Sequence, residues 1–448
     1  MTNWTTYIYV VLPHPTEQLV LAQATLTGLT LPLNAQPERI SFVDSQVIKP
    51  ILDELTGMPV NLLHYVARHL DEAASRTYLA FLVEPRALEY SIGGVWESLE
   101  NVLENCDLPN EMIEGLLNWQ TMHRSGIIPE RRAPWALPGW HATAEAWVID
   151  QLARLERSAL CNLEPLKTWS ISCVFKVITE SGVLYFKASR DLPLFVNEGV
   201  TLTRLADLYP GSIPVPVALA PERGWMLLDD FGEALGDDAS LDQQVLMMQD
   251  YARLQINSSQ KIPALLAAGC KDRRLDILLS QIEPLLADKL VLQRLNPDEH
   301  DKVKQIAPRL HSLLIELMSL PVPPTIMHGD LHAGNVVLTN DKFLYFDWTD
   351  AAVSHPFFDM IHVYWVEDEM KRMALREAYL AVWEQEFPKA DVRRAWELAD
   401  VLYGFYHAVS YQYIAHGIED LVVSELNFAY YYLRKLLSGL EKLDNLQG

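Results

Sequence analysis

The stretch "TIMHGDLHAGNVVLTNDKFLYFDW", residues 325–348, concentrates side chains that could do chemistry. Two histidines, an aspartate and an asparagine lie within eight residues, and Asp347 follows after an apolar segment. "NVVLTNDKFLYFD" has the pattern of two strands around a turn, and a hairpin centred on residue 341 would pair Asn335 with Asp347, about 5 Å apart at the backbone. An amide oxygen and a carboxylate that converge there suit a hard divalent cation such as Mg²⁺.

Asp330 lies in the loop that leads into the first of these strands and can reach the same space without binding the metal. Phosphoryl transfer needs this arrangement, because the protein must hold the metal, neutralise phosphates and accept a hydroxyl proton. A lone HGD, or an aspartate at the end of a strand, is common and indicates little. The conjunction H-G-D-L-x-x-G-N plus F-D-W predicts a functional site, with Asp330 as catalytic base and Asn335 and Asp347 as metal ligands.

The pattern "HGDLHAGN…FDW" resembles the catalytic loop and metal-binding motif of the aminoglycoside phosphotransferase and choline kinase family. The resemblance covers roughly Pro134 to the C-terminus and includes "FDWTDAAVSHPFFDM", where Asp359 would brace the loop rather than touch substrate. It implies a protein-kinase-like fold, in which the same roles belong to H-R-D-L-x-x-x-N and D-F-G motifs. It also implies ATP or GTP as the phosphate donor and Mg²⁺ as the cofactor.

A kinase-like site further needs a cation on the nucleotide phosphates and a carboxylate that positions this cation. The resemblance assigns the cation to Lys187 in "YFKAS", at the end of the second strand of a hairpin predicted around residues 180–182. A strand lysine is otherwise usually a solvated edge residue. Glu198 in "LFVNEGV" is the acid within the first two turns of the next predicted helix, and we expect it to pair with Lys187.

The loop "TWSISC", residues 168–173, lies opposite Lys187 across this hairpin and would cover the phosphates with backbone N–H groups and the hydroxyl of Ser170 or Ser172. The chain departs from protein kinases here, because it has no G-x-G-x-x-G. "MLLDDFG", residues 226–232, would hold the base through backbone groups, which leaves ATP and GTP undistinguished.

The composition narrows the class of protein. The formal net charge of −23 and the lack of a basic patch argue against nucleic-acid binding, while an acidic surface would tolerate a cationic small substrate. No apolar run approaches 18 residues, so we expect no membrane span, and the first residues do not resemble a signal peptide. The four scattered cysteines favour a reducing, cytoplasmic location and argue against disulfide and zinc sites. The oligomeric state stays open.

The chain is long enough for two or three domains. We expect an α+β protein with a small α/β domain at 1–128 and a Pro-rich linker at 129–140. A β-rich kinase-like N-lobe at 141–236 and a helical C-lobe at 237–448 would follow, the latter holding the catalytic and metal-binding loops.

Residues 1–128 faintly resemble a Nudix hydrolase domain, with a strand hairpin around residues 13–17 and a helix ending "LDELTGM". The Nudix box R-E-x-x-E-E-x-G is degenerate here, since Pro50, Ile51 and Leu55 replace an arginine and two glutamates and only Glu54 survives. The resemblance therefore implies a catalytically dead domain, which weighs against a Nudix-type hydrolase. An unrelated α/β domain fits equally well.

The acceptor should bind in the helical region after Asp347, where residues 403–420 carry tyrosines and histidines on more than one helix face. A mixed role in core and pocket is the prediction for them, and Glu419 and Asp420 could meet a cationic amine or end a solvated helix. We thus expect a kinase acting on a small hydroxyl-bearing substrate. The alternative is a nucleotide-binding regulatory pseudokinase with a ligand-sensing N-terminal domain, against which the intact set Asp330, Asn335, Asp347 and Lys187 weighs.

Overall fold

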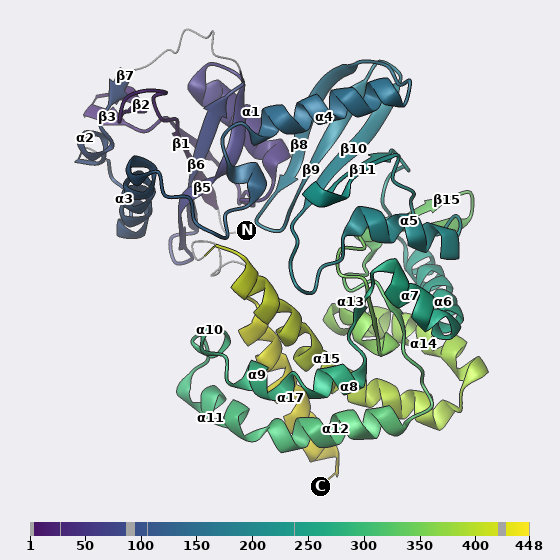
Figure 1. The fold of residues 1–448 in the computed structure, drawn as a ribbon. Helices are drawn as coiled ribbons and strands as arrows, with labels where there is room; N and C mark the ends of the chain where they lie inside the picture. The colour runs from purple at the N-terminus through teal and green to yellow at the C-terminus, as the bar shows by residue number, and fades with distance from the viewer. Residues whose placement is uncertain are drawn as a thin grey trace. The chain divides into compact units, whose positions relative to one another are not determined.

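The computed structural model describes residues 4–26, 28–86, 95–104, 106–236, 238–419 and 427–447. Contacts divide the chain into two compact units (Figure 1). The first comprises Met1–Ala188 and Ile418–Leu421, and the second comprises Ser189–Gly417 and Val422–Gly448. The division into domains that we expect from the sequence, with a linker at 129–140, stays a prediction.

A mixed four-stranded sheet with the order β4-β1-β6-β5 forms the centre of the first unit. Strand β1 runs parallel to β6 and antiparallel to β4, and β5 runs antiparallel to β6. Three shorter strands form a second sheet with the order β3-β2-β7. The strands are β1 (Thr5–Val11), β2 (Val20–Thr25), β3 (Gly28–Thr30), β4 (Leu33–Gln36), β5 (Val60–Asp71), β6 (Arg76–Pro85) and β7 (Val95–Glu97).

The hairpin expected around residues 13–17 forms only in part. A single bridge joins Pro13 to Val20, but β1 and β2 belong to different sheets. The reason is that both edges of β1 are already occupied by β4 and β6. Helices α2 (Leu99–Glu104) and α3 (Asn110–Ser125) contribute Leu99, Leu116 and Trp119 to the buried apolar cluster over this region.

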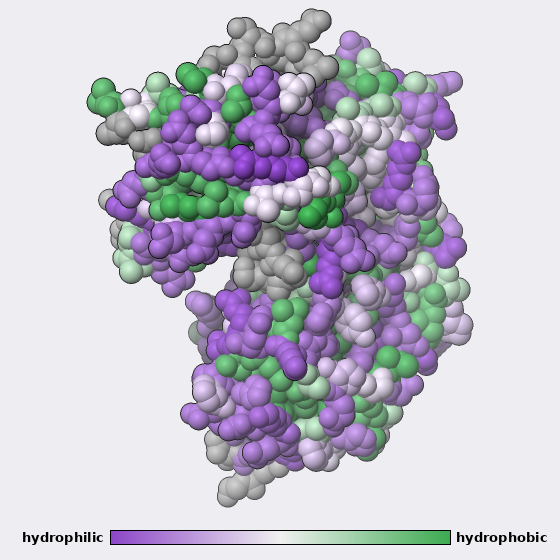
Figure 2. Space-filling model, turned by 60° about the vertical axis from the view of Figure 1, so that its left-hand side comes forward, coloured by the Kyte–Doolittle hydropathy of each residue, from purple (hydrophilic) through white to green (hydrophobic). Residues whose placement is uncertain are grey.

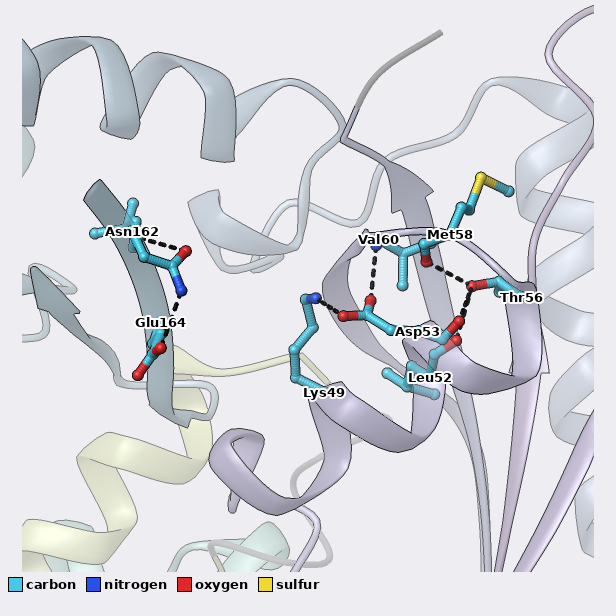
Figure 3. A network of polar contacts seen from close by, with 9 residues as sticks. Lys49, Leu52, Asp53, Thr56, Met58, Val60, Asn162 and Glu164 are labelled. Carbon is cyan, nitrogen blue, oxygen red and sulfur yellow. Dashed lines mark hydrogen bonds and ion pairs between the residues drawn. The ribbon is translucent and has the colours of Figure 1, made fainter. Parts of the chain in front are cut away.

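Helix α1 (Ser45–Thr56) ends within the segment that the sequence predicts as a helix end. Asp44 caps it by accepting from the backbone N–H of Val47, and Gly57 ends it in the left-handed conformation, with φ of 68°. Figure 3 shows how Asp53 holds the following turn: its carboxylate pairs with Lys49 and accepts from the N–H of Val60 at 2.9 Å. Asp53 thus has a structural role, and the Nudix-like character of residues 1–128 stays a prediction.

The rest of the first unit holds α4 (Trp140–Arg154) and three consecutive neighbouring strands, β8 (Leu160–Thr168), β9 (Ser172–Thr179) and β10 (Gly182–Ser189). β9 and β10 confirm the hairpin predicted around residues 180–182. Within the segment expected as a linker, Trp135 is 2% exposed and its indole N–H donates to the carbonyl of Trp169 at 2.8 Å. This segment therefore packs against the β8–β9 turn.

The second unit is mainly helical (Figure 1). Its helices are α5 (Glu198–Leu208), α6 (Leu241–Ser258), α7 (Ile262–Ala268), α8 (Leu275–Leu279), α9 (Ile282–Leu286), α10 (Lys289–Leu292), α11 (Pro297–Gln305), α12 (Ala307–Ser319), α13 (Ile361–Trp365), α14 (Glu369–Glu386), α15 (Lys389–Gly417) and α17 (Ala429–Gln447). Its strands are β11 (Ala218–Ala220), β12 (Trp225–Asp229), β13 (Lys271–Asp272), β14 (Thr325–Met327), β15 (Val336–Thr339), β16 (Lys342–Tyr345) and β17 (Ala352–Ser354).

Short strands of the second unit frame the motif residues. β14 leads into His328, the hairpin β15–β16 follows, and β17 returns to pair antiparallel with β14 and parallel with β13. The order of strands and helices along the chain confirms the expected α+β class. On the face shown in Figure 2, hydrophilic side chains spread widely and hydrophobic ones gather in smaller groups. Among the described helices, none has the length and apolar composition that crossing a membrane requires.

Candidate active site

The β15–β16 hairpin corrects the register expected from the sequence. Val336 lies opposite Tyr345 and Thr339 opposite Lys342, so the centre of the turn lies between residues 340 and 341 rather than on residue 341. The two turn residues have positive φ, 51° at Asn340 and 60° at Asp341, as a two-residue type I′ turn requires. The expected pairing of Asn335 with Asp347 is therefore wrong by one residue, and the carbonyl of Asn335 instead accepts from the N–H of Phe346 at 3.0 Å.

Asp347 lies just past this hairpin in a backbone conformation that few residues other than glycine adopt, with φ of 64°. The hydroxyl of Thr349 lies 3.0 Å from Asp347 Oδ1 and 3.0 Å from Glu198 Oε2. This hydroxyl has one proton and can donate to only one of the two carboxylates at a time. A non-glycine residue held at positive φ must be stabilised by its surroundings, and such residues cluster at functional sites.

Glu198 supplies much of that stabilisation from the first position of α5. Its side chain is 3% exposed, and its Oε1 accepts from the backbone N–H of Trp348 at 3.1 Å. The backbone N–H of Val196 also donates to the carbonyl of Thr349 at 3.0 Å. The structure thus connects Glu198 to the two residues that follow Asp347. Lys187, 7% exposed, belongs to the first unit, and its pairing with Glu198 stays a prediction.

Asp359 holds the loop that carries the candidate base, which confirms its expected bracing role. It is 1% exposed, and its two carboxylate oxygens accept from the backbone N–H of His328 at 2.8 Å and of Gly329 at 2.7 Å. Tyr251 on α6 donates its hydroxyl to the same carboxylate. Burial raises the pKa of Asp359, while the hydrogen bonds from these donors favour its charged form.

The first histidine of the motif connects the loop of Asp330 with the strand end that precedes Asp347. His328 is fully buried, and its Nε2 lies 2.7 Å from the carbonyl oxygen of Phe346, next to Asp347. The ring therefore carries its proton on Nε2, and its Nδ1 accepts from the backbone N–H of Asp330 at 3.4 Å. One neutral ring thus fixes the loop of Asp330 against the strand end that precedes Asp347.

Asp330 combines a fixed backbone with an accessible carboxylate. Its side chain is 58% exposed, and its carbonyl accepts from the side-chain amide of Asn335 at 2.9 Å. Asn335 is 7% exposed, and this hydrogen bond uses its amide nitrogen, so its amide oxygen stays available as a ligand. An amide oxygen and a carboxylate are ligands that suit Mg²⁺, and the role of Asn335 and Asp347 as metal ligands stays a prediction.

The residues expected to contact phosphates lie in the first unit. Ser172 is the first residue of β9, and its hydroxyl accepts from the indole N–H of Trp169 at 2.8 Å, which leaves the hydroxyl proton free to be donated. Ser170 lies in the turn between β8 and β9. The contact of Ser170, Ser172 and Lys187 with a nucleotide stays a prediction.

Sequence reasoning missed two contributors to this site. His362 on α13 lies beside His332, with ring centroids 4.7 Å apart, although no motif connects them. Tyr251 reaches Asp359 from 108 residues away in the chain. Neither side chain carries a local signal, because each is placed by the packing of a helix against the loop.

The helix expected to bind the acceptor is α15, and most of its aromatic side chains are core residues. Tyr403, Tyr406 and His407 are buried, and Tyr406 stacks on Phe358 with ring centroids 5.2 Å apart. Glu419 is bound by Arg132 within the first unit, and Asp420 lies outside the described residues.

Comparisons with known proteins agree with the motif. Residues 192–396 match the model of the phosphotransferase enzyme family, APH. No curated protein matches the sequence. The family match confirms the resemblance seen in the motif and the α+β, protein-kinase-like class expected from it.

Solved structures give distant similarities. A choline/ethanolamine kinase family protein from Mesorhizobium loti is 16% identical, over 66% of this chain and 94% of its own, with a TM-score of 0.44. The GDP complex of aminoglycoside 2′-phosphotransferase-IIIa is 15% identical, over 67% and 99%, with a TM-score of 0.47. Choline kinase LicA from Streptococcus pneumoniae is 14% identical, over 66% and 99%, with a TM-score of 0.46. By its own match to the family model, the segment 192–396 belongs to the phosphotransferase enzyme family.

Proposed function

We propose that the protein is a Mg²⁺-dependent phosphotransferase that moves the γ-phosphate of ATP or GTP to a hydroxyl group of a small molecule. One observation carries the proposal. The carboxylate of Asp330 is exposed on a loop whose backbone is fixed by Asp359, His328 and Asn335, and that loop is bonded to the strand end preceding Asp347. A general base needs this combination of accessible carboxylate and fixed backbone.

Asp330 would accept the proton of the acceptor hydroxyl as the oxygen attacks the γ-phosphorus. Asn335 and Asp347 would hold Mg²⁺, which when bound neutralises charge on the phosphate oxygens. Lys187 would contact the phosphates, and the turn with Ser170 and Ser172 would cover them. Glu198 would have two roles. It accepts hydrogen bonds from residues 348 and 349, and it is the expected ion-pair partner of Lys187.

The acceptor class is open to a direct screen. The family and the net charge of −23 are compatible with a hydroxyl-bearing substrate that carries a cation. A suitable first set is an aminoglycoside, a macrolide, spectinomycin, choline and ethanolamine, each with MgATP and with MgGTP. Release of ADP or GDP above the rate with water as the acceptor identifies the substrate.

Two substitutions test the assignment of roles. Asp330→Asn should leave nucleotide binding intact and lower kcat on the order of 10²–10⁴-fold, as the loss of a general base does. Asp347→Ala should abolish the Mg²⁺-dependent part of the thermal stabilisation by nucleotide. Asp301→Asn, an exposed pair partner of Lys304, is a matched control for both. Normal turnover in Asp330→Asn would remove the proposed base, and a normal Mg²⁺-dependent shift in Asp347→Ala would remove the proposed metal ligand.

A second candidate, a regulatory nucleotide-binding protein whose first unit senses a ligand, is favoured by one cavity. The cavity lies within the first unit, measures about 870 Å³, and is lined by His64, Trp119, Arg132 and Glu419 among others. This volume lies in the range of ligand sites. Nucleotide-dependent stabilisation without ADP or GDP release for any acceptor would favour this second candidate over the first.

A further inference from the structure

The second histidine of the motif has a fixed tautomer, with its proton on the nitrogen that lies nearer the candidate base. The Nδ1 atom of His332 accepts from the backbone N–H of Gly334 at 3.1 Å. A neutral imidazole that accepts at Nδ1 carries its proton on Nε2. That Nε2, which carries the proton, lies 3.8 Å from Oδ2 of Asp330.

The ring of His332 can lie this close to the backbone because residue 334 is a glycine. A Cβ atom at Gly334 would lie 2.7 Å from Cε1 and 2.8 Å from Nδ1 of His332, closer than such atoms pack. Any larger residue at this position would push the ring away from the N–H that fixes its tautomer. The motif's glycine and histidine therefore act as one local unit.

His362 packs against the ring of His332. The two rings lie 4.7 Å apart with an interplanar angle of 39°, and both line a cavity of about 140 Å³ beside Met248 and Leu375. Burial lowers the pKa of His362 to about 3. His362 thus packs against His332 as a neutral ring.

The same three side chains also have the composition of a transition-metal site. Ligand atoms of Asp330, His332 and His362 lie within 4.8 Å of one another, and two imidazoles with a carboxylate are a common metal-binding set. Binding at Nε2 of His332 would require a lone pair there and a proton on Nδ1, opposite the N–H of Gly334. The geometry therefore favours His332 as a donor to Asp330 over His332 as a metal ligand.

We infer that His332 is a positioning residue that orients the carboxylate of Asp330 toward the acceptor hydroxyl. The inference rests on the proposed role of Asp330 as base. The distance of 3.8 Å exceeds a hydrogen bond, but contacts of this kind commonly tighten once substrate is bound. Because Asp330 is fixed by its backbone and its carboxylate is exposed, this N–H restricts the direction in which the carboxylate points.

Two isosteric substitutions separate the two nitrogen atoms of His332. His332→Asn keeps an acceptor near the Nδ1 position, and so the bond from Gly334, but removes the donor. His332→Gln keeps a donor near the Nε2 position and removes the acceptor. We expect His332→Asn to lower kcat about tenfold with an unchanged KM for the nucleotide, and His332→Gln to retain most of kcat. His311→Asn and His311→Gln, at an exposed position on α12, are matched controls.

The assay is ADP or GDP release from MgATP or MgGTP, with water as the acceptor and with any acceptor found in the screen. In the Asp330→Asn background neither His332 substitution should change the residual rate, because a residue that acts through Asp330 has nothing left to position. A further loss in that background would show a separate, structural role and would overturn the inference.

Three other results would also overturn the inference. In the first, His332→Asn turns over like wild type while Asp330→Asn does not. In the second, His332→Gln loses as much kcat as His332→Asn. In the third, wild type binds one Co²⁺ with a ligand-field absorption that His332→Asn abolishes, since this would assign Nε2 to a metal. If wild type shows no turnover, or Asp330→Asn turns over normally, the proposed function itself fails, and this outcome is distinct from the first three.

Discussion

Removal of Glu198 should loosen the loop that carries Asp347. In Glu198→Ala the buried backbone N–H of Trp348 loses its acceptor, which costs about 1–3 kcal/mol, and truncation of a buried side chain adds about 1 kcal/mol more. The hydroxyl of Thr349 can still donate to Asp347, so the loss of its hydrogen bond to Glu198 adds little. We therefore expect local opening of residues 346–350 to become easier by about 2–4 kcal/mol.

Amide hydrogen exchange of the peptide that contains Trp348 measures this directly. Protection of its backbone N–H should fall roughly 30- to 900-fold in Glu198→Ala, since about 1.4 kcal/mol corresponds to a factor of ten. Glu198→Gln should retain most protection, because its amide oxygen can still accept from Trp348 and the Thr349 hydroxyl can accept from its amide nitrogen.

Glu369→Ala is the matched control, because Glu369 is also the first residue of a helix but is exposed. Equal protection of Trp348 in Glu198→Ala and Glu369→Ala would refute the reasoning. The Gln variant also tests the expected ion pair with Lys187. In Glu198→Gln, unchanged protection of the Trp348 N–H together with weaker nucleotide binding would show that the charge of Glu198 supports nucleotide binding independently of the loop.

Two further predictions concern Gly329 and the buried histidines. Gly329→Ala should lower stability by about 2–4 kcal/mol and abolish turnover, because Gly329 has φ of 90° and a Cβ there would lie 2.3 Å from the Cβ of Asp350. Gly211→Ala, at φ of 82° with no atom within 4 Å of the new Cβ, is the control, and equal urea midpoints would contradict the steric argument. Burial lowers the pKa of His355 and His407 to about 3, below the value in the unfolded chain. The stability that comes from their neutral forms should therefore be present above about pH 6.5 and be lost as the pH falls. At pH 5 each of these two histidines should lower the free energy of unfolding by about 2 kcal/mol. A His355→Phe variant that loses as much stability in acid as wild type would contradict this.

Much of the local structure could be predicted from the sequence. Helix α1 begins after Asp44 and ends at Gly57 because a capping side chain and a left-handed glycine act within a few residues. The sequence predicts the hairpin of the motif as well, but the predicted register differs from the observed one by one residue. The exact positions of residues with positive φ at Asn340 and Asp341 decide that register, and the pattern of apolar residues does not specify them.

The sequence by itself determined which residues could do the chemistry. Asp330, Asn335 and Asp347 lie within 18 residues, and their types and spacing alone predict phosphoryl transfer. Only the tertiary structure decided what holds them. Glu198 reaches Trp348 across 150 residues, and Asp359 receives Tyr251 across 108. These contacts depend on how α5 and α6 pack against the loops, and a long-range contact of this kind leaves no periodic or local signal in the chain.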